Sequence, residues 1–382
     1  MLRLFSRPQI PPSLCVKRTL SGAIFTLAVM LSGVACVSAS EDRRLETADL
    51  WPLGSVGDPV VSPEGDWIAY TVSRRDQSAD ETRSRIWMVP VSGGEPLALT
   101  TEALSSWQPR WSPDGRYLAF LSARDGKPTQ VWALNRLGGE ATVLTDTPQS
   151  VSDFAWSPDG QSLALVLQDL DPDHAAALAA GEKWEAKPKP WVIDREYFKQ
   201  DYVGYLDRRR THIYRFDLAD NGLHQLTGGD FDDSDPAWSP DGSQLVFVSK
   251  RVELPDLSTN TDLFLVSAEP EQKGMGELRR LTVNPGSDFA PSWSPDGKQL
   301  AYITTLNPET LFYETQHLAI TAVASGDTRV LTESIDRWVY GPQFTPDGEN
   351  VMFMLENSGE QHLAQLPAAG GDLERFVVGQ DV

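Results

Sequence analysis

The stretch PRWSPDGRYLAFLS, residues 109–122, decides the fold, because five close copies of it occur elsewhere in the chain. The copies are PVVSPEGDWIAYTV at 59, FAWSPDGQSLALVL at 154, PAWSPDGSQLVFVS at 236, PSWSPDGKQLAYIT at 291 and PQFTPDGENVMFML at 342. The turn motifs within them begin at Val61, Trp111, Trp156, Trp238, Trp293 and Phe344. Successive motifs are 45–55 residues apart, except for a gap of 82 between 156 and 238. Such a period is typical of β-propeller blades.

A second signature recurs in phase with the first. It reads GGEPLALT up to Thr100 and GGEATVLT up to Thr145, with further copies ending at Thr227, Thr282 and Thr332 and a degenerate one at Val377. A third apolar run, such as RIWMVPV or HIYRFDL, lies between the two signatures. Each repeat therefore predicts four strands, which is the content of a propeller blade. We predict an all-β propeller of six blades, at about 56–100, 104–145, 149–227, 231–282, 286–332 and 336–377.

The repeated motif contains what a tight turn requires. Proline fixes φ at the first corner, aspartate accepts hydrogen bonds from nearby backbone, and glycine adopts positive φ. The aromatic residue before the turn is expected to pack against a neighbouring blade. The strands that follow, such as LAFLS and VMFML, are apolar nearly throughout, so we expect both of their faces to be covered. We interpret the motif aspartates as structural rather than catalytic.

The N-terminal 40 residues differ from the rest of the chain. Basic residues at 3, 7, 17 and 18 precede an apolar run over 20–37 and then the small residues SAS. This order predicts a secretory signal peptide at 1–40, hence an exported protein, periplasmic or secreted, with the propeller at 41–382. Lipidation at Cys36 is the less favoured alternative. Because Cys15 and Cys36 are the only cysteines, the predicted mature chain has no disulfide and no cysteine-bound metal.

The formal net charge of −21 at pH 7 argues against nucleic acid and anionic membrane as partners. Beyond the signal peptide, we expect no membrane partner. The simplest interpretation of the charge is a soluble, acidic surface.

The 82-residue gap places an insertion, residues 169–208, inside blade three. An alanine-rich piece predicts a short helix, and the alternation KPKP after it predicts extended chain. Aromatic residues then become dense. Two interpretations of the insertion stay open. Its aromatic side chains form an exposed contact surface, or the inserted segment folds back on its own blade. The aromatic residues concerned are Trp184, Trp191, Tyr197, Phe198, Tyr202 and Tyr205.

A search for catalytic motifs finds none. The motifs G-x-S-x-G, H-E-x-x-H and G-x-G-x-x-G and the P-loop are absent. The cluster DFDDSD, residues 230–235, lacks EF-hand spacing and is interpreted as a solvated loop. Of the five histidines, three occupy the same position in their strands and are interpreted as framework residues. These three are His212, His317 and His362, and the other two are His174 and His224. We therefore predict no catalytic, cofactor-binding or metal-binding residue and no cofactor.

The repeats resemble the TolB-like propeller of several exported proteins. Three stretches, LETADLWPLGSVGDPVVSPEGDWIAYTVS, KPWVIDREYFKQDYVGYLDRRRTHIYRFDL and LTGGDFDDSDPAWSPDG, resemble more specifically one group of bacterial serine peptidases. That group is the prolyl oligopeptidase family, of the acylaminoacyl-peptidase and dipeptidyl-peptidase type, and the resemblance is to its N-terminal propeller. It runs from about Leu45 to the end of the chain.

The resemblance implies a role beside a catalytic domain. In that family an α/β-hydrolase domain with a Ser-Asp-His triad follows the propeller, which covers the active site and admits short peptides. No position of this sequence matches the triad, and the family commonly has more blades than the six found here. We therefore expect a fragment or truncated product. Its partners would be short peptides or a hydrolase domain, and it would be inactive alone.

Two alternatives remain open. In the first alternative, the chain is a stand-alone TolB-like periplasmic scaffold that binds an envelope protein or peptide. This hypothesis is favoured if six blades close a ring by themselves. Or it is a propeller enzyme, for example one acting on carbohydrate, with carboxylates or histidines converging on the axis. The repeats show no departure that would indicate such a site.

Overall fold

The computed structural model describes residue 44 and residues 46–201, 203–269 and 275–376. The predicted signal peptide, Cys15, Cys36 and Tyr202 lie outside these described residues. Residues from Thr47 onward form one compact unit. No helix in the described ranges is long and apolar enough to cross a membrane.

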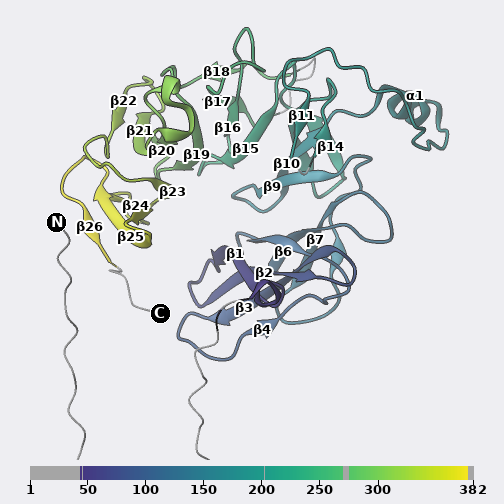
Figure 1. The fold of residues 1–382 in the computed structure, drawn as a ribbon, viewed down its shortest axis with the longest axis horizontal. Helices are drawn as coiled ribbons and strands as arrows, with labels where there is room; N and C mark the ends of the chain where they lie inside the picture. Colours follow the sequence, from purple (N-terminus) through teal and green to yellow (C-terminus); the bar gives the residue numbers. More distant parts are fainter. Residues whose placement is uncertain (1–43, 45, 202, 270–274, 377–382) are drawn as a thin grey trace, which may run out of the picture. The chain divides into compact units, whose positions relative to one another are not determined.

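Six four-stranded antiparallel sheets follow one another along the chain, so the predicted six-bladed propeller is confirmed (Figure 1). A short 3-10 helix, η1 (Thr47–Leu50), precedes them. Blade one contains β1 (Gly54–Val61), β2 (Trp67–Asp76), β3 (Glu81–Pro90) and β4 (Leu97–Ala98). Blade two contains β5 (Trp107–Trp111), β6 (Tyr117–Ser122), β7 (Gln130–Asn135) and β8 (Thr142–Val143). Blade three contains β9 (Val151–Trp156), β10 (Ser162–Gln168), β13 (Thr211–Asp217) and β14 (Gly222–Gln225).

The second half of the propeller repeats the same arrangement. Blade four contains β15 (Asp233–Trp238), β16 (Gln244–Ser249), β17 (Asp262–Ser267) and β18 (Arg279–Arg280). Blade five contains β19 (Asp288–Trp293), β20 (Gln299–Thr304), β21 (His317–Ala322) and β22 (Thr328–Val330), with the 3-10 helix η2 (Pro308–Tyr313) before β21. Blade six contains β23 (Val339–Phe344), β24 (Asn350–Asn357), β25 (Glu360–Pro367) and β26 (Glu374–Arg375).

The repeated motif forms the hairpin between the first two strands of each blade. In blade three, the Asp159 carboxylate accepts from the Ser157 hydroxyl at 2.6 Å and from the Gln161 amide at 3.0 Å. Gly160 has φ +69°, a value that a residue with a Cβ adopts only at a cost. These bonds, the Ser157 hydroxyl foremost, lower the pKa of Asp159. The same contacts recur at Asp114, Asp241, Asp296 and Asp347, so the structural interpretation of the motif aspartates is confirmed.

The motif tryptophans join neighbouring blades, as predicted. Each indole N–H donates to a backbone carbonyl in the first strand of the preceding blade. The pairs are Trp111 to Val60 at 3.2 Å, Trp156 to Arg110 at 3.4 Å, Trp238 to Ala155 at 3.2 Å and Trp293 to Ala237 at 3.0 Å. One hydrogen bond therefore fixes the register of each of these four junctions.

The core consists of apolar layers between successive blades. Five clusters of buried side chains join blades one to two, two to three, three to four, four to five and five to six. The second strands of blades two to five lie between two such layers, and nearly all their residues are buried. The prediction that both faces of these strands are covered is confirmed for the four inner blades.

The two end blades differ from that prediction. In β24 buried and half-buried residues alternate: Phe353 faces blade five, while Met352 and Met354 remain half-buried. The strand β2 alternates in a similar way. No hydrophobic cluster among the described residues joins blade six to blade one. The covering expected for VMFML is therefore wrong for one face, since no blade built from the described residues packs there.

Candidate binding site on the inserted segment

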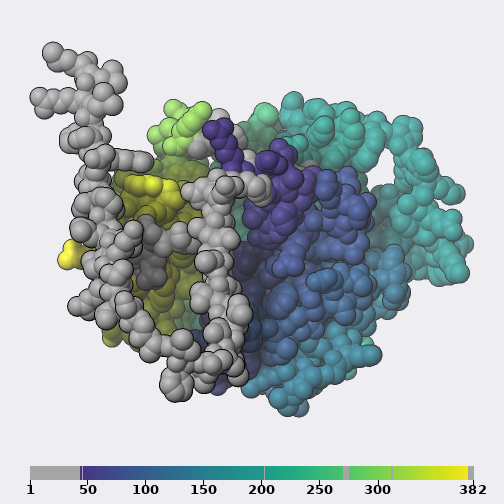
Figure 2. All heavy atoms as spheres, turned by 60° about the horizontal axis from the view of Figure 1, so that its bottom comes forward, coloured from purple at the N-terminus to yellow at the C-terminus, as the bar shows by residue number. Residues whose placement is uncertain are grey.

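The insertion leaves blade three after β10 and returns to it at β13. It contains one helix, α1 (Pro172–Ala180), and a two-stranded ribbon of β11 (Lys199–Gln200) and β12 (Gly204–Tyr205). Figure 1 shows α1 standing away from the sheet of blade three, and in Figure 2 the segment forms part of a teal lobe at the surface. The predicted helix in the alanine-rich piece is confirmed.

Local signals define the ends of α1. Asp171 is the N-cap and accepts from the Asp173 amide at 2.9 Å, and Pro172 stands in the first turn, where its missing N–H costs nothing. Gly181 ends the helix in the left-handed conformation, with φ +68°. No residue of α1 is buried, so caps and local contacts hold it rather than a core.

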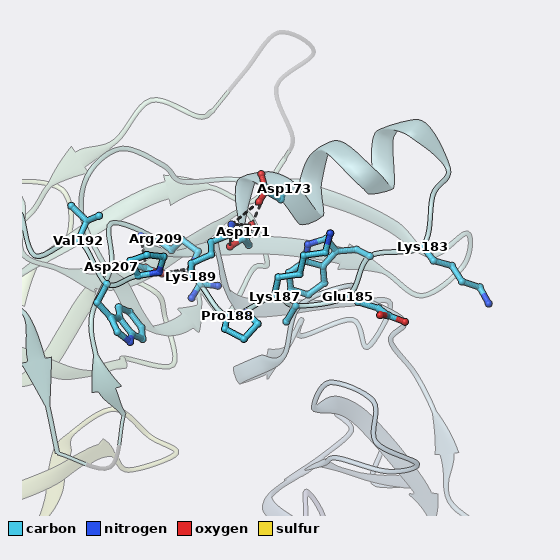
Figure 3. A pocket seen from close by; sticks show the side chains of 14 residues that line it. Asp171, Asp173, Lys183, Glu185, Lys187, Pro188, Lys189, Val192, Asp207 and Arg209 are labelled. Atoms are coloured by element: carbon cyan, nitrogen blue, oxygen red, sulfur yellow. Dashed lines mark hydrogen bonds and ion pairs between the residues drawn. The ribbon is translucent and has the colours of Figure 1, made fainter.

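A cleft opens between α1 and the extended segment that follows it (Figure 3). Its volume is about 1210 Å³, large enough for a short peptide. Four basic and four acidic side chains line it, together with Trp184, Trp191 and the proline-rich stretch. The basic residues are Lys183, Lys187, Lys189 and Arg209, and the acidic ones are Asp171, Asp173, Glu185 and Asp207.

One cation closes the helix end of the cleft. The Lys189 ammonium lies 2.6 Å from Asp173 and 3.3 Å from Asp171, so it bridges two carboxylates of the first helical turn (Figure 3). The bond to Asp173, followed by that to Asp171, raises the pKa of Lys189. The backbone N–H of Asp173 lowers the pKa of Asp171. The contact holds the KPKP stretch beside the helix.

Aromatic rings form the walls of this surface. Trp184 stacks on His174 with 4.3 Å between ring centroids, and Trp191 meets Tyr205 at 5.2 Å. Trp191 is 58% exposed, and Tyr197, Phe198 and Tyr205 are also exposed. An exposed group of large rings is unusual for a soluble surface and is typical of a contact site.

The segment is also anchored to the body of the propeller. The Arg195 guanidinium donates to both carboxylate oxygens of Asp256, at 2.6 and 3.1 Å, and to the Asp207 carbonyl at 2.7 Å. Asp256 belongs to the connection between β16 and β17, so the bond ties the insertion to blade four. The base of the insertion is therefore folded back on the propeller, while the exposed rings stay a candidate contact surface.

The aspartate cluster at 230–235 is only partly the solvated loop that we predicted, because Asp230, Asp232 and Asp235 are exposed but most of its charge is paired with arginine. Arg210 donates to Asp230 at 2.8 Å and to Asp232 at 3.0 Å. Asp233 is buried and accepts two bonds from Arg251, at 2.8 and 2.9 Å. The ion pairs and the burial of Asp233 were not predicted, because the arginines that neutralise the cluster are distant in the sequence. The cluster serves as an ion-pair network at the root of the insertion.

Polar residues lie three positions before four of the six turn motifs, whereas the last two repeats carry alanine and glycine there. The register of the first strand shifts here, and Asp58, Gln108 and Asp235 have positive φ. Gln108 donates to Asp153 of the next blade. Burial raises the pKa of Asp153 and of Asp235. Apart from Asp235, which belongs to the cluster at 230–235, these residues were not singled out from the sequence, although their common offset from the motif is a signal that could have found them.

The remaining sequence-level candidates are structural. His212, His317 and His362 are buried, as expected of framework positions, and His224 is half-buried beside Asp217. In the described part of the chain, no group of three or more histidine, cysteine, aspartate or glutamate residues could hold a metal ion. The features of this surface that the structure does show are aromatic walls and balanced charge.

Comparison with known proteins gives this architecture a class. Residues 206–381 match the family described as TolB beta propeller domain. The propeller domain superposes on the Pyrococcus horikoshii acylaminoacyl peptidase with a TM-score of 0.63 at 17% identity, over 86% of this chain and 47% of that one. The fold is thus that of a TolB-like propeller of the kind found in that peptidase.

Two curated sequence relatives are named as peptidases. "Uncharacterized peptidase YuxL" of Bacillus subtilis is 34% identical over 226 residues, which is 59% of this chain and 34% of the relative. Dipeptidyl-peptidase 5 of Porphyromonas gingivalis is 25% identical over 346 residues, which is 86% of this chain and 48% of the relative. The chain is a propeller similar in sequence to these two peptidases, and it spans half or less of their length.

Proposed function

We propose that this chain is the peptide-binding propeller of an exported serine peptidase of the prolyl oligopeptidase type. The similarity to dipeptidyl-peptidase 5 carries the proposal, since it extends over 86% of the chain and so includes the central insertion. A propeller of this kind acts beside a hydrolase domain. It selects short peptides and holds them while the triad of the other domain cleaves.

The cleft of the insertion suits a short peptide. A peptide presents a positive amino end, a negative carboxyl end and side chains that are often apolar. The cleft offers aspartates, lysines and the rings of Trp184 and Trp191 within one concave space. Apolar walls with a few placed charges are typical of small-ligand sites.

The first experiment measures binding of di- to tetrapeptides to the purified protein by tryptophan fluorescence and calorimetry. We expect saturable binding, weakened about fivefold to tenfold by Trp191→Ala, because an exposed ring that stacks on a ligand contributes about 1 kcal/mol. The matched control is Tyr313→Ala, which removes a ring that is 94% exposed but lies outside the insertion. It should leave binding unchanged.

Two outcomes would contradict the proposal. One is an absence of saturable binding for every peptide up to four residues at millimolar concentration. The other is peptide hydrolysis by this chain after contaminants are removed, because the sequence contains no nucleophile motif and a separate hydrolase domain would then be unnecessary.

A stand-alone scaffold is the second candidate, favoured by the match of residues 206–381 to the TolB propeller family. It predicts a stoichiometric protein partner without a hydrolase fold and no affinity for short peptides. Affinity purification followed by the same peptide titration separates the two functions.

Export is proposed on the order of basic, apolar and small residues in the first 40 positions. We expect mass spectrometry of the protein recovered from a bacterial envelope fraction to find a new N-terminus between residues 36 and 41. An intact Met1 on cytoplasmic protein would contradict it.

A further inference from the structure

Two carboxyl groups, Asp262 and Asp288, are buried together at the junction of blades four and five. Asp262 begins β17 and Asp288 begins β19, and both side chains are 0% exposed. The Asp288 amide donates to the Thr261 carbonyl at 2.8 Å, and the Thr261 hydroxyl donates to the Asp288 carbonyl at 3.0 Å. The two strands that carry the carboxyl groups are therefore bonded side by side.

The groups available to neutralise this pair are few. Arg280 of β18 lies 2.6 Å from one oxygen of Asp262. Within the described part of the chain, neither oxygen of Asp288 has a hydrogen-bond partner of normal geometry. The hydroxyls of Thr282 and Thr304 lie near it without such a bond. Two carboxylates would face one guanidinium, which leaves one negative charge uncompensated away from water.

The preceding junction shows how the same position is neutralised elsewhere in this chain. There, Asp233 occupies the place of Asp288, and His212 occupies the place of Asp262. Arg251 lies 13 residues after the motif Trp238, and its Nη2 donates to both carboxylate oxygens of Asp233. In blade five the residue 13 positions after Trp293 is Leu306. The repeat has thus exchanged an arginine for leucine and a histidine for a second aspartate.

We propose that Asp288 is held as a neutral carboxylic acid in the folded protein, and that loss of its proton to solvent loosens the junction of blades four and five. The proton supplies the single positive charge that the pocket lacks. A carboxyl group within a dry, apolar junction is stable only when neutral or paired. The junction therefore responds to pH, which goes beyond the peptide-binding role proposed above.

The titratable groups around Asp288 agree with this assignment. Burial is the main cause that raises the pKa of Asp288 to about 7, and the charge of Asp262 also raises it. The polar side chains of Thr282, Thr304 and Asn284 act in the opposite direction and lower this pKa. Burial also raises the pKa of Tyr302 to about 12. The ionisable residues on the strands packed against β19 are Asp233 and Asp235 on β15, Asp262 on β17, Tyr302 on β20 and Tyr340 on β23, with none on β16. Two more ionisable residues of blades four and five lie near the pair. They are Arg280 on β18 and His317 on β21, and the His317 ring contacts the Thr332 carbonyl.

The test compares the thermal unfolding midpoint of the whole protein with that of Asp288→Asn between about pH 4 and pH 9. A folded pKa raised above the unfolded value gives stability that is present at low pH and lost as pH rises towards the folded pKa. We expect Asp288→Asn to raise the midpoint by about 3–5 °C at pH 8 and to give no advantage near pH 4. An equal effect at all pH values, or a lower midpoint at pH 8, would overturn the proposal.

Two further variants guard against a trivial explanation. Leu306→Arg places an arginine in blade five at the position that Arg251 holds in blade four, so it should also raise the unfolding midpoint at pH 8. In the Asp288→Asn background the same substitution should give no further gain. Asp233→Asn is the matched control. It removes a carboxylate that Arg251 already neutralises, so it should lower the midpoint at pH 8.

The readouts also separate a proton from a metal ion and locate the change. Addition of Ca²⁺ or of a chelator should leave the wild-type midpoint unchanged. A Ca²⁺-dependent rise that Asp288→Asn abolishes would overturn the proposal in favour of a cation site. Hydrogen exchange should show residues 261–267 and 286–293 opening faster above pH 7 in the wild type, after correction for the intrinsic rate, and not in Asp288→Asn.

Discussion

Single residues of the repeat act mainly through the backbone. The Asp159 carboxylate, with the Ser157 hydroxyl, closes the hairpin of blade three, and equivalent residues do so in other blades. A depressed pKa here reports hydrogen bonds rather than chemistry. The informative residues are those that break the pattern, such as Leu306 and Asp262 at the blade four–five junction.

Replacement of Asp159 by alanine should lower the free energy of unfolding by about 0.5–1 kcal/mol at neutral pH, since two hydrogen bonds to an exposed, water-screened carboxylate are lost. The pKa of Asp159 is lowered in the folded state, so its contribution is present above the unfolded value of 3.8 and lost as pH falls through the folded pKa. Urea denaturation at pH 7 and pH 3 measures this. Asp66→Ala removes an exposed carboxylate without a hydrogen bond among the described residues and should change little.

At the scale of elements, the inserted segment combines an ordered base with an exposed aromatic face. Its helix has no buried residue, so its order depends on caps and on ion pairs with distant parts of the chain. Arg195 is the central anchor, because its side chain is only 8% exposed and binds Asp256 with both prongs. The Arg195 contact, foremost among the causes, lowers the pKa of Asp256.

Arg195→Ala should leave the fold intact but accelerate limited proteolysis within residues 183–200 by about tenfold or more, since it strands a partly buried carboxylate. Arg208→Ala is the matched control, because the Arg208–Asp194 pair at 2.8 Å is about half exposed and contributes little. Its cleavage rate should stay within about twofold of the wild type. If both variants accelerated proteolysis equally, the burial of the Arg195–Asp256 pair would not make it a stronger anchor than the exposed Arg208–Asp194 pair.

At the scale of the whole molecule, stability comes from apolar layers between blades rather than within them. Counting only the residues that the structure describes, each inner blade is covered on both faces, whereas the end blades are covered on one. Neighbour contacts of this kind make the array approximately one-dimensional, so the end blades are its weakest part.

The asymmetry of blade six predicts unequal effects of two adjacent substitutions. Phe353→Ala should cost about 3–5 kcal/mol in unfolding free energy, because the ring is 1% exposed in the layer with blade five. The Met354 side chain points away from that layer, so Met354→Ala should lower the unfolding free energy by only about 1 kcal/mol. Equal losses in chemical denaturation would show that another surface covers blade six in solution.

The sequence by itself determined the blades, because each repeat carries its own turn, tryptophan and apolar strand. Local chemistry is sufficient to predict such features: the WSPDG hairpins, the capped helix over 172–180 and the framework histidines all follow from residues close in sequence. Only the tertiary structure decided what depends on distant partners. It gave Asp230 and Asp232 to Arg210, tied Arg195 to Asp256, left one face of VMFML uncovered and brought Asp262 beside Asp288. The physical reason is that charge compensation and burial depend on which groups meet in space, and a repeat fixes the position of each residue without fixing its neighbour.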